Sequence, residues 1–417
     1  MKTQKVALSS VAKIIMGTSP KGDTYNNTGN GLPLINGPTE FGDDHPDCTL
    51  FTTKSSKECN AGDLIFCVRG STTGRMNWAD KKYSLGRGVC SIRGNTQADT
   101  IYIRYCIEQS LHKLLQFASG ATFPNLTKDT IVSFKIPYPN DRERIVDIVQ
   151  KYDALANINR RRIQLLEEAA RLLFREWFVY FRFPLLRQGF GGQAGHEKVR
   201  MADGVPEGWK SEKLNKLVSF LGGHAFKSTS YKQEGKYGIV TIKNVQQGSF
   251  IPECTDYLDE TPNAMKKHCF LSNGDILISL TGNVGRVCLV YGENYLLNQR
   301  VAKIESKNKI PKCFIYWMFD NPIMQKRIEN LSYGSAQQNL SPIKLGEQTV
   351  ILPPDPLLES FDEIVSLINI EIIQLLIQNQ KLAQARDLLL PRLMSGAIDP
   401  VRYDKLSNGV EVLNYGP

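Results

Sequence analysis

Residues 274–287 read GDILISLTGNVGRV, a glycine–aspartate turn followed by a short apolar strand and a glycine loop that closes on arginine. A similar stretch, GDLIFCVRGSTTGR, occupies residues 62–75, 212 positions earlier. Two more pairs follow in the same order. SGATFPNLT (119–127) matches YGSAQQNLS (333–341) at an offset of 214, and IPYP (136–139) matches LPPD (352–355) at 216. Three landmarks at a nearly constant offset predict a duplicated module.

Each copy ends in a long segment without glycine or proline, residues 141–182 in the first and 357–390 in the second. Apolar residues recur there at helical spacing, and one row repeats every seven residues. That row is Tyr152, Asn159, Leu166 and Leu173 in the first copy and Ile368, Leu375, Leu382 and Leu389 in the second. Matching heptads predict that the two helices pack together as a coiled coil, with Asn159 placed to set register or direction.

The remaining segments read as short strands and turns, which predicts an α+β fold: two duplicated α/β domains joined by two long antiparallel helices. Helices of roughly 34 to 40 residues would be about 50–60 Å long, so a domain is expected at each end of the pair. The predicted parts are a first domain at 1–140, a central helix at 141–183, a linker at 184–206 with a glycine-rich insertion at 185–195, a second domain at 207–354, a distal helix at 355–400 and a tail at 401–417.

The composition is that of a globular protein, with 41% apolar and 22% charged residues in 417. The net charge of +9 favours a polyanionic partner. Nine scattered cysteines without a C-x-x-C pair indicate reduced thiols and no zinc site. No apolar run approaches the length of a membrane span, and the first residues lack the pattern of a signal peptide. We therefore expect a cytoplasmic protein without a membrane partner.

Catalytic motifs are not found in the sequence. Neither a Walker A loop nor G-x-G-x-x-G occurs, and TGNVGR lacks the lysine that would reach a phosphate. The Asn/Asp-Pro-Pro-aromatic signature of amino-methyltransferases is also missing. Glu234-Gly235-Lys236 has the E-x-K spacing of nucleases, but it reads as a hairpin turn and has no convincing partner aspartate. We expect no catalytic residue, metal or cofactor in this chain.

Binding chemistry, in contrast, is present in both copies. Arginine suits guanine edges and phosphates, asparagine and glutamine suit adenine, and small hydroxyl residues donate to phosphate. For each single residue, a solvated turn or a structural hydrogen bond is favoured over contact with a ligand, and the duplication supports the group rather than the individual residue. The candidate DNA-binding residues are Arg69, Ser71, Thr72, Arg75, Thr122 and Asn125 in the first copy, and Lys227, Ser228, Tyr231, Lys243, Asn244, Thr281, Asn283, Arg286, Gln337, Gln338 and Asn339 in the second.

These motifs resemble the specificity (S) subunit of type I restriction–modification systems. The resemblance covers nearly the whole chain and rests on the repeated loops, on VPEGWKSEKLNKLVSFLGGHAFKSTSY (205–231) and on IIMGTSPKGDTYN (14–26). It also rests on the helical segments LLEEAARLLFREWF (165–178) and LLLPRLMSG (388–396). The first copy departs from the pattern because it lacks a PEGW lead-in.

The resemblance implies two target-recognition domains that read the halves of a bipartite double-stranded DNA sequence, and a helix pair that sets the spacer between them. It also implies docking of two methyltransferase subunits, which bind S-adenosylmethionine, and of restriction subunits that use ATP and Mg²⁺. The S subunit itself would be non-catalytic. Two alternatives stay open, an enzyme with degenerate motifs and a DNA-binding scaffold that is non-specific or inactive. Outward helix residues such as Arg160, Arg161, Glu168 and Arg175 could be solvated or could dock a partner.

Overall fold

The computed structural model describes residues 4–119, 124–183, 201–202, 205–332 and 339–403. These residues form two compact units that do not follow chain order. The first unit takes the residues up to Leu155 and those from Leu382 onward, and the second takes Ala156–Lys381. Each unit therefore includes part of both long helices. The predicted insertion at 185–195 and most of the predicted tail at 401–417 lie outside the described residues.

Short strands and helices make up the first unit. Its strands are β1 (Lys5–Ala7), β2 (Ala12–Met16), β3 (Tyr25–Asn26), β4 (Leu32–Ile35), β5 (Phe51–Thr52), β6 (Glu58–Cys59), β7 (Leu64–Cys67), β8 (Met76–Trp78), β9 (Tyr83–Leu85), β10 (Val89–Gly94) and β11 (Lys135–Pro137). Its helices are α1 (Leu8–Val11), the 3₁₀ turns η1 (Gly22–Thr24) and η2 (Pro38–Glu40), α2 (Gln97–Leu115), α3 (Lys128–Ser133), the beginning of α4 (Arg142–Phe178) and the end of α9 (Asp355–Met394). One sheet has the order β2-β10-β7-β8, and another has the order β3-β5-β4-β9-β6.

The second unit is built in the same way. Its strands are β12 (Met201–Ala202), β13 (Val205–Pro206), β14 (Lys210–Lys213), β15 (Val218–Gly222), β16 (Tyr237–Val240), β17 (Val245–Gln246), β18 (Ser249–Phe250), β19 (Tyr257–Leu258), β20 (Phe270–Leu271), β21 (Ile276–Ser279), β22 (Val287–Leu289), β23 (Tyr295–Leu297), β24 (Val301–Ser306) and β25 (Thr349–Leu352). Its helices are the later part of α4, α5 (Leu214–Leu217), η3 (Ser228–Ser230), η4 (Lys267–Cys269), α6 (Lys312–Asp320), α7 (Pro322–Ser332), α8 (Pro342–Gly346) and most of α9.

Strand order confirms the predicted α+β fold and its duplication. The sheet β2-β10-β7-β8 of the first unit corresponds to β15-β24-β21-β22 of the second. The parallel pair β4–β9 corresponds to β16–β23, and the antiparallel pair β1–β11 corresponds to β14–β25. The copies differ in one helical segment. In the first unit, α2 runs unbroken for 19 residues. In the second unit the corresponding segment is divided into two helices, because α6 ends at Asp320 and α7 begins at Pro322. Proline lacks the N–H that would continue the α6 ladder.

An aromatic cluster forms the centre of the second unit. Phe361 on α9 is fully buried and lies 4.8 Å from Phe178, 5.7 Å from Trp177 and 6.1 Å from Phe174 of α4, measured between ring centroids. Phe314 of α6 lies 5.0 Å from Phe178 with nearly perpendicular rings. Edge-to-face pairs of this kind add to the free energy of simple burial. The two long helices are thus part of the domain core rather than an appendage to it.

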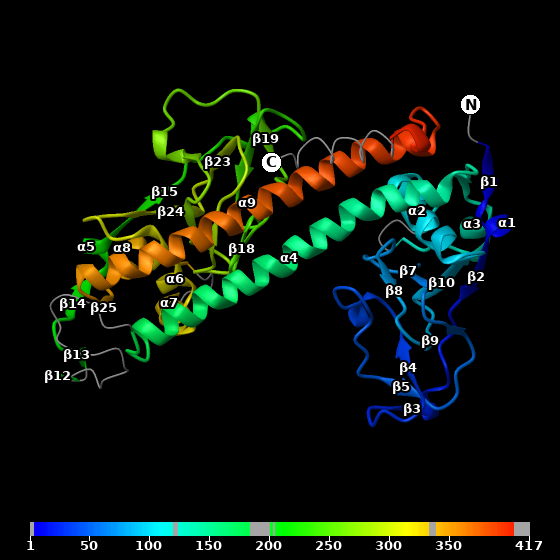
Figure 1. Ribbon diagram of the computed structural model, residues 1–417, viewed down its shortest axis with the longest axis horizontal. Helices are drawn as coiled ribbons and strands as arrows, with labels where there is room; N and C mark the ends of the chain where they lie inside the picture. Colours follow the sequence, from blue (N-terminus) through cyan, green and yellow to red (C-terminus); the bar gives the residue numbers. More distant parts are fainter. Residues whose placement is uncertain (1–3, 120–123, 184–200, 203–204, 333–338, 404–417) are drawn as a thin grey trace, which may run out of the picture. The chain divides into compact units, whose positions relative to one another are not determined.

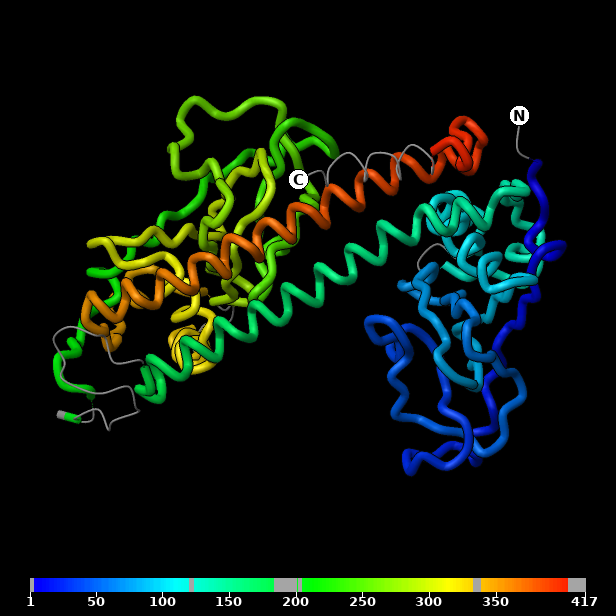
Figure 2. Tube along the Cα trace, in the orientation of Figure 1, coloured from blue at the N-terminus to red at the C-terminus, as the bar shows by residue number. Residues whose placement is uncertain are grey.

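Within each unit, the segments of α4 and α9 run side by side in opposite directions (Figure 1, Figure 2). In the second unit, Ile163 of α4 and Ile372 and Leu375 of α9 form an apolar cluster, with Leu166 and Ile368 of the heptad row packed against it. The other members of the row are also turned inward. Leu173 packs against the core of the second unit, Tyr152 and Leu389 belong to the core region of the first, and Leu382 is half-buried.

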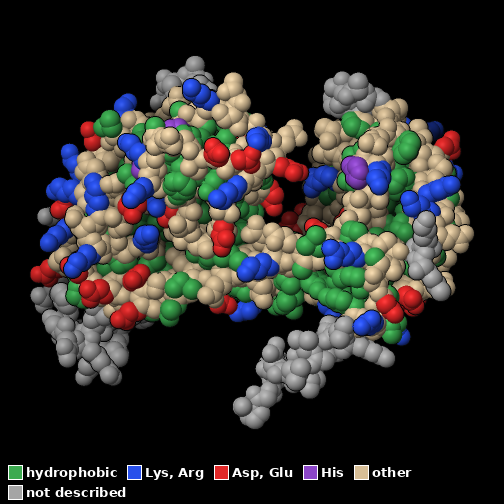
Figure 3. All heavy atoms as spheres, turned by 90° about the horizontal axis from the view of Figure 1, so that it is seen from above, with side chains coloured by type: hydrophobic (Ala, Val, Ile, Leu, Met, Phe, Trp, Pro, Cys, Tyr) green, Lys and Arg blue, Asp and Glu red, His purple; other side chains and the backbone are tan. Residues whose placement is uncertain are grey.

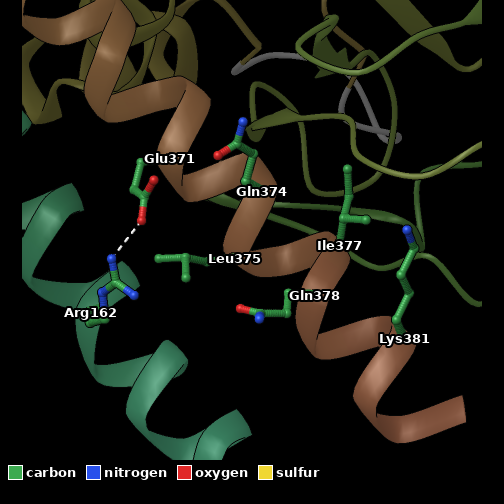
Figure 4. Close-up of a pocket in the computed structure, with 7 residues that line it drawn as sticks. All are labelled: Arg162, Glu371, Gln374, Leu375, Ile377, Gln378 and Lys381. Carbon is green, nitrogen blue, oxygen red and sulfur yellow. Dashed lines mark hydrogen bonds and ion pairs between the residues drawn. The ribbon is translucent and has the colours of Figure 1, made fainter. Parts of the chain in front are cut away.

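Asn159 interrupts this apolar row with a buried polar contact. Its side chain is 1% exposed, and its Nδ2 donates to Gln378 Oε1 at 2.9 Å and to Asn379 Oδ1 at 3.0 Å. One turn further along, Arg162 pairs with Glu371 at 2.6 Å across an open groove of about 410 Å³ (Figure 4). The groove is lined by Arg162, Glu371, Gln374, Leu375, Ile377, Gln378 and Lys381. Such a polar layer restricts the ways in which two helices can pair.

A buried carboxylate ties the start of α4 to α2 in the first unit. Asp99 is fully buried, forms a capping box with Thr96, accepts from Tyr138 Oη at 2.9 Å and is paired with Arg142. Burial by itself would raise the pKa of Asp99, but the hydrogen bonds from Arg142 and Tyr138 outweigh burial and lower it. A carboxylate with a lowered pKa stabilises the fold above its unfolded pKa of about 4 and loses that effect as pH falls through the folded value.

We therefore expect Asp99→Asn to lower the unfolding temperature at pH 7 by several degrees, and to lower it much less at pH 3. Thermal unfolding of the full chain at both values measures the difference. Asp147→Asn, which changes an exposed carboxylate on α4, is the control and should have little effect at either pH. An Asp99→Asn effect of equal size at pH 3 would contradict the assignment.

Candidate nucleic-acid interface

The repeated glycine–aspartate turn has a structural role in both units. Gly62 and Gly274 have φ of 84° and 80°, a conformation that favours glycine. The aspartate that follows is buried in each case. Asp63 Oδ2 accepts from Ser91 Oγ at 2.7 Å and from the N–H of Asn60 at 3.0 Å, and its carboxylate pairs with Arg93. This half of the repeated motif therefore holds the sheet together.

Asp275 plays the same part in the second unit. Its Oδ2 accepts from the N–H of Ser272 at 2.9 Å, and its Oδ1 lies 2.9 Å from Lys303 Nζ. Burial opposes the charge of Lys303, but the contact with Asp275 outweighs burial and raises the pKa of Lys303. A cation on the neighbouring strand thus neutralises the buried aspartate in both copies.

The glycines of the following loop divide into two kinds. A Cβ on Gly285 would lie 2.4 Å from Ile328 of α7, and one on Gly74 would lie 2.9 Å from Leu111 of α2. These two glycines allow the loop to pack on a helix of its own unit. A Cβ on Gly70, in contrast, would meet nothing within 4 Å. Space for another backbone to come close is thus present at Gly70, and Gly74 and Gly285 serve internal packing.

The first two landmarks of the repeat lie side by side in each unit. Arg69 bridges to Asn125, and its Nε donates to Asn125 Oδ1 at 3.2 Å. In the second unit the corresponding bridge joins Thr281 to Asn339. The next residue anchors the second loop each time, because the N–H of Leu126 donates to Val68 O at 2.9 Å and that of Leu340 donates to Leu280 O at 2.8 Å.

A third segment joins them through the turn before β10 and β24. The N–H of Val68 donates to Gly88 O at 2.8 Å, and that of Leu280 donates to Arg300 O at 2.9 Å. This contact brings two exposed arginines, Arg87 and Arg300, to the loops. Neither was among the sequence candidates, although LGRGV (85–89) and LNQRV (297–301) repeat at the same offset of 212 as the glycine loops.

We call these three segments the loop edge of each unit. In the first unit it comprises residues 68–75, 85–89, 119 and 124–126, and in the second it comprises residues 280–286, 297–301 and 339–340. Exposed side chains there carry arginine, hydroxyl and amide groups. In both units the same frame presents different residues, since Arg69 corresponds to Thr281 and Gly88 to Arg300.

The sequence candidates are distributed unevenly over the described surface. Exposed candidates are Arg69, Ser71, Thr72, Arg75, Lys227, Ser228, Lys243, Asn283 and Asn339. Half-buried candidates are Asn125, Tyr231, Thr281 and Arg286. Thr122, Gln337 and Gln338 lie outside the described residues. Lys227, Ser228, Tyr231 and Lys243 are not part of the loop edge as defined by the three segments.

Two candidates have partners inside the protein. Asn244 is 2% exposed, and its Nδ2 donates to the carbonyl oxygens of Ile251 at 2.9 Å and Glu253 at 3.0 Å. It therefore stabilises the chain around β17 and β18, which is a structural role. Arg286 donates through Nη1 to Gln246 Oε1 of β17, so its guanidinium is turned toward that hairpin. Within the described residues, Thr281 Oγ1 is the buried side-chain oxygen or nitrogen atom that lacks a hydrogen-bond partner.

The described residues combine surface charges of both signs with buried thiols. On the face shown in Figure 3, Lys and Arg side chains are interspersed with Asp and Glu side chains. Burial raises the pKa of the Cys67 thiol beneath the first loop edge, and that of Cys59 and Cys254 to about 12, so these thiols are protonated at neutral pH. The described residues contain no cluster of His, Cys, Asp or Glu that could hold a metal ion. Among the described helices, none has the length and apolarity required to span a bilayer.

Known proteins share this architecture and its repeat. The family described as "Type I restriction modification DNA specificity domain" matches residues 2–168 and again residues 206–377. The chain is 24% identical over 364 residues to the type I restriction enzyme MjaIX specificity subunit of Methanocaldococcus jannaschii, covering 83% of this chain and 81% of that protein. It is 25% identical over 342 residues to the HindI specificity subunit of Haemophilus influenzae, covering 69% and 74%.

A shorter match joins the chain to a protein of M. jannaschii named as the MjaX specificity subunit, with 33% identity over 162 residues and 38% of each chain covered. Among solved structures, the type I restriction–modification S subunit from M. genitalium has the same fold, with a TM-score of 0.55, 17% identity and coverage of 94% of this chain and 95% of that one. The chain therefore belongs to the family of type I restriction–modification specificity subunits, and it carries two DNA specificity domains.

Proposed function

We propose that this chain is the non-catalytic subunit that reads the two halves of a bipartite DNA target, one with the loop edge of each unit. The observation that carries the proposal is the repeated frame, in which a bridge between two loops is preserved. Its asparagine is kept as Asn125 and Asn339, while the opposite residue changes from Arg69 to Thr281. An unchanged frame with altered polar groups is what two readers of different sequences require, because base identity is read by side-chain donors and acceptors.

We further propose that α4 and α9 set the number of unread base pairs between the half-sites and dock the other subunits. Support for docking comes from apolar side chains that both helices leave exposed in the second unit. On α4, Ile158, Leu165 and Leu172 recur every seven residues and are 57%, 48% and 42% exposed. On α9, Leu367 is 65% exposed and Ile370 is 51% exposed. Their seven-residue spacing places the three α4 side chains on one helix face, and apolar side chains gathered on an exposed face mark sites of protein–protein contact.

The partners in this proposal are two methyltransferase subunits, which hold S-adenosylmethionine, and restriction subunits, which use ATP and Mg²⁺. No cofactor is assigned to this chain, and the assembly is proposed to act in the cytoplasm. The outward residues Arg160, Arg161, Glu168 and Arg175 are all exposed on α4 and are available to such partners.

Mapping methylated adenines in host DNA, with and without this gene, tests the proposal and supplies the target sequence. Single variants then assign the halves. We expect Arg69→Ala to reduce the preference for the correct base in one half about ten-fold or more, and Arg300→Ala to do so in the other half, since one arginine contact to a base contributes about 1–3 kcal/mol. Each variant should leave the opposite half unchanged.

Two results would overturn the proposal. Gene-independent methylation would remove the link between this chain and a DNA target. An equal loss of preference in both halves from one folded variant would contradict the two-reader arrangement. Methylation or binding without any sequence preference would favour a non-specific DNA-binding scaffold.

A further inference from the structure

A buried carboxylate in the second unit connects three elements that are distant in sequence. Asp320, the last residue of α6, has a side chain that is 4% exposed. Its Oδ2 accepts from Arg171 Nε of α4 at 2.8 Å, and its Oδ1 accepts from Gln247 Nε2 at 2.6 Å. Gln247 lies in the turn between β17 and β18. The long helix is thus bonded, through one carboxylate, to a hairpin of the recognition domain.

The hairpin in turn holds the end of the glycine loop. Gln247 Oε1 accepts from the N–H of Val287 at 3.3 Å, and the N–H of Gly248 donates to Val287 O at 2.8 Å. The neighbouring Gln246 accepts from the guanidinium of Arg286. The side chain and the backbone at the end of the loop are therefore both fixed by Gln246, Gln247 and Gly248.

Arg171 also touches the turn directly. Gly248 has a φ of 72°, and a Cβ placed on it would lie 3.1 Å from Arg171 Nη2. The guanidinium stacks 5.6 Å from the Trp317 ring centroid, and Nη2 is 3.6 Å from Glu167 Oε2. Burial by itself would lower the pKa of Arg171, but the contact with Asp320 outweighs burial and raises the pKa. Arginine remains charged, so Asp320 keeps its counter-ion at all ordinary pH values.

Open space surrounds this contact. A cavity of about 480 Å³ is bordered by Arg171, Trp317 and Asp320, and another of about 230 Å³ is bordered by Arg171, Gln247 and Gly248. The strands of the hairpin are anchored by apolar packing, since Val245 and Phe250 are buried in a core cluster of the second unit. Its exposed turn is joined to α6 and α4 by polar contacts, in which Gln247 and Arg171 both bond Asp320. The position of the turn therefore depends on these polar contacts.

We propose that Arg171, a residue of the long helix, is a positioning residue for DNA reading by the second unit. Through Asp320 and Gln247 it fixes the β17–β18 turn, and the turn orients Arg286 and the end of the second loop edge. The inference rests on the proposed DNA reading. It adds that the helix and the reading loops are coupled, so a change on α4 alters sequence preference in one half-site.

The first unit does not repeat this contact among its described residues. Arg386 of α9 bonds Asp153 of α4 at 2.7 Å, and Tyr105 of α2 donates to the same aspartate at 2.6 Å. The arginine there joins the two long helices to each other and reaches the domain through a tyrosine of α2. We therefore expect the coupling to affect the half-site read by the second unit.

The test replaces the chromosomal gene with Arg171→Gln, Arg171→Lys, Gln247→Met and the control Lys326→Gln, and measures adenine methylation in host DNA at correct and singly altered sites. Lys326 is an exposed cation on α7 of the same unit, outside the loop edge and the long helices. The half read by the second unit is the one whose preference changes in Arg300→Ala and stays unchanged in Arg69→Ala. Methylation is normalised to the amount of the chain in the cell.

We expect Arg171→Gln and Gln247→Met to lower the ratio of correct to altered sites about ten-fold in the second half-site, and to leave the first half-site unchanged. Arg171→Lys should restore most of the ratio, because lysine still supplies a cation to Asp320. Lys326→Gln should match the unaltered gene.

A uniform fall in methylation with both ratios intact would show that the contact only stabilises the fold, and would overturn the inference. Unchanged ratios in both Arg171→Gln and Gln247→Met would also overturn it. If Arg171→Gln does not accumulate, Gln247→Met decides, since Gln247 is exposed and its replacement leaves Arg171 paired with Asp320. Failure of the unaltered gene to direct methylation would instead contradict the proposed function.

Discussion

Replacing Phe361 with alanine should unfold the second unit at a temperature about 10 °C lower than in the unaltered chain. Phe361 is a residue of α9 whose side chain is fully buried against three aromatic rings of α4. Truncating a buried phenylalanine costs about 3–5 kcal/mol through lost transfer free energy and the cavity that remains. For a unit of this size each kcal/mol corresponds to about 2–4 °C.

Near-ultraviolet circular dichroism during heating measures this loss, because the signal reports the packing of Trp177 and its neighbours. Phe270→Ala is the matched control. Phe270 lies on β20, is 42% exposed and makes one edge contact with Tyr237, so its loss should cost less than about 1 kcal/mol. Equal effects of the two variants would contradict the central role of the aromatic cluster.

Replacing Ile158 or Leu367 with aspartate should weaken association with the proposed methyltransferase partner about 100-fold or more while the chain remains folded. Both side chains are more than half exposed on the long helices. A charge at the centre of an apolar interface has to be desolvated without a partner, and such positions commonly contribute 2 kcal/mol or more to binding. Co-purification and titration of tagged chain with methyltransferase measure the loss.

Ile343→Asp is the control for this prediction, because Ile343 is 76% exposed and belongs to α8 rather than to either long helix. If both helix variants bind the methyltransferase as well as the unaltered chain does, these side chains do not take part in docking. Deletion of residues 357–396 is a weaker test. It would also remove Leu357, Leu358 and Phe361 from the core, so loss of binding could follow from unfolding.

The repeated landmarks allowed the architecture to be predicted, because a duplicated strand–loop pattern needs no knowledge of long-range contacts. The heptad row was readable for the same reason, and it places Asn159 in the helix pair. The partners of Asn159 were not readable, since Gln378 and Asn379 lie some 220 positions away and their contact depends on register. Local periodicity predicts which face of a helix is buried, but it does not predict which residues of the partner helix pack against that face.

The candidate site was less accessible to sequence reasoning. Arg286 follows a glycine loop, a position at which an arginine is expected to be exposed and to contact a ligand. Its guanidinium instead donates a hydrogen bond to Gln246, 40 positions earlier in the sequence. Asn244 has a side chain suited to adenine, but its amide group donates hydrogen bonds to two backbone carbonyl groups of its own unit. Arg87 and Arg300 were missed because the turns that carry them resemble ordinary strand connections. In each case the destination of a polar side chain depends on a partner supplied by the fold.

The division of the chain into units has a consequence for its synthesis. Leu389, Leu390 and Leu393 of α9 belong to the same core as Ile145 and Val149, whereas the second unit is a continuous stretch of chain. A ribosome adds about 5–20 residues per second, so the first unit waits on the order of tens of seconds for its last helix. During that interval its apolar face is uncovered while the second unit can already close. The part of the protein made first is thus completed last, and nascent chains should recruit chaperones through the N-terminal half.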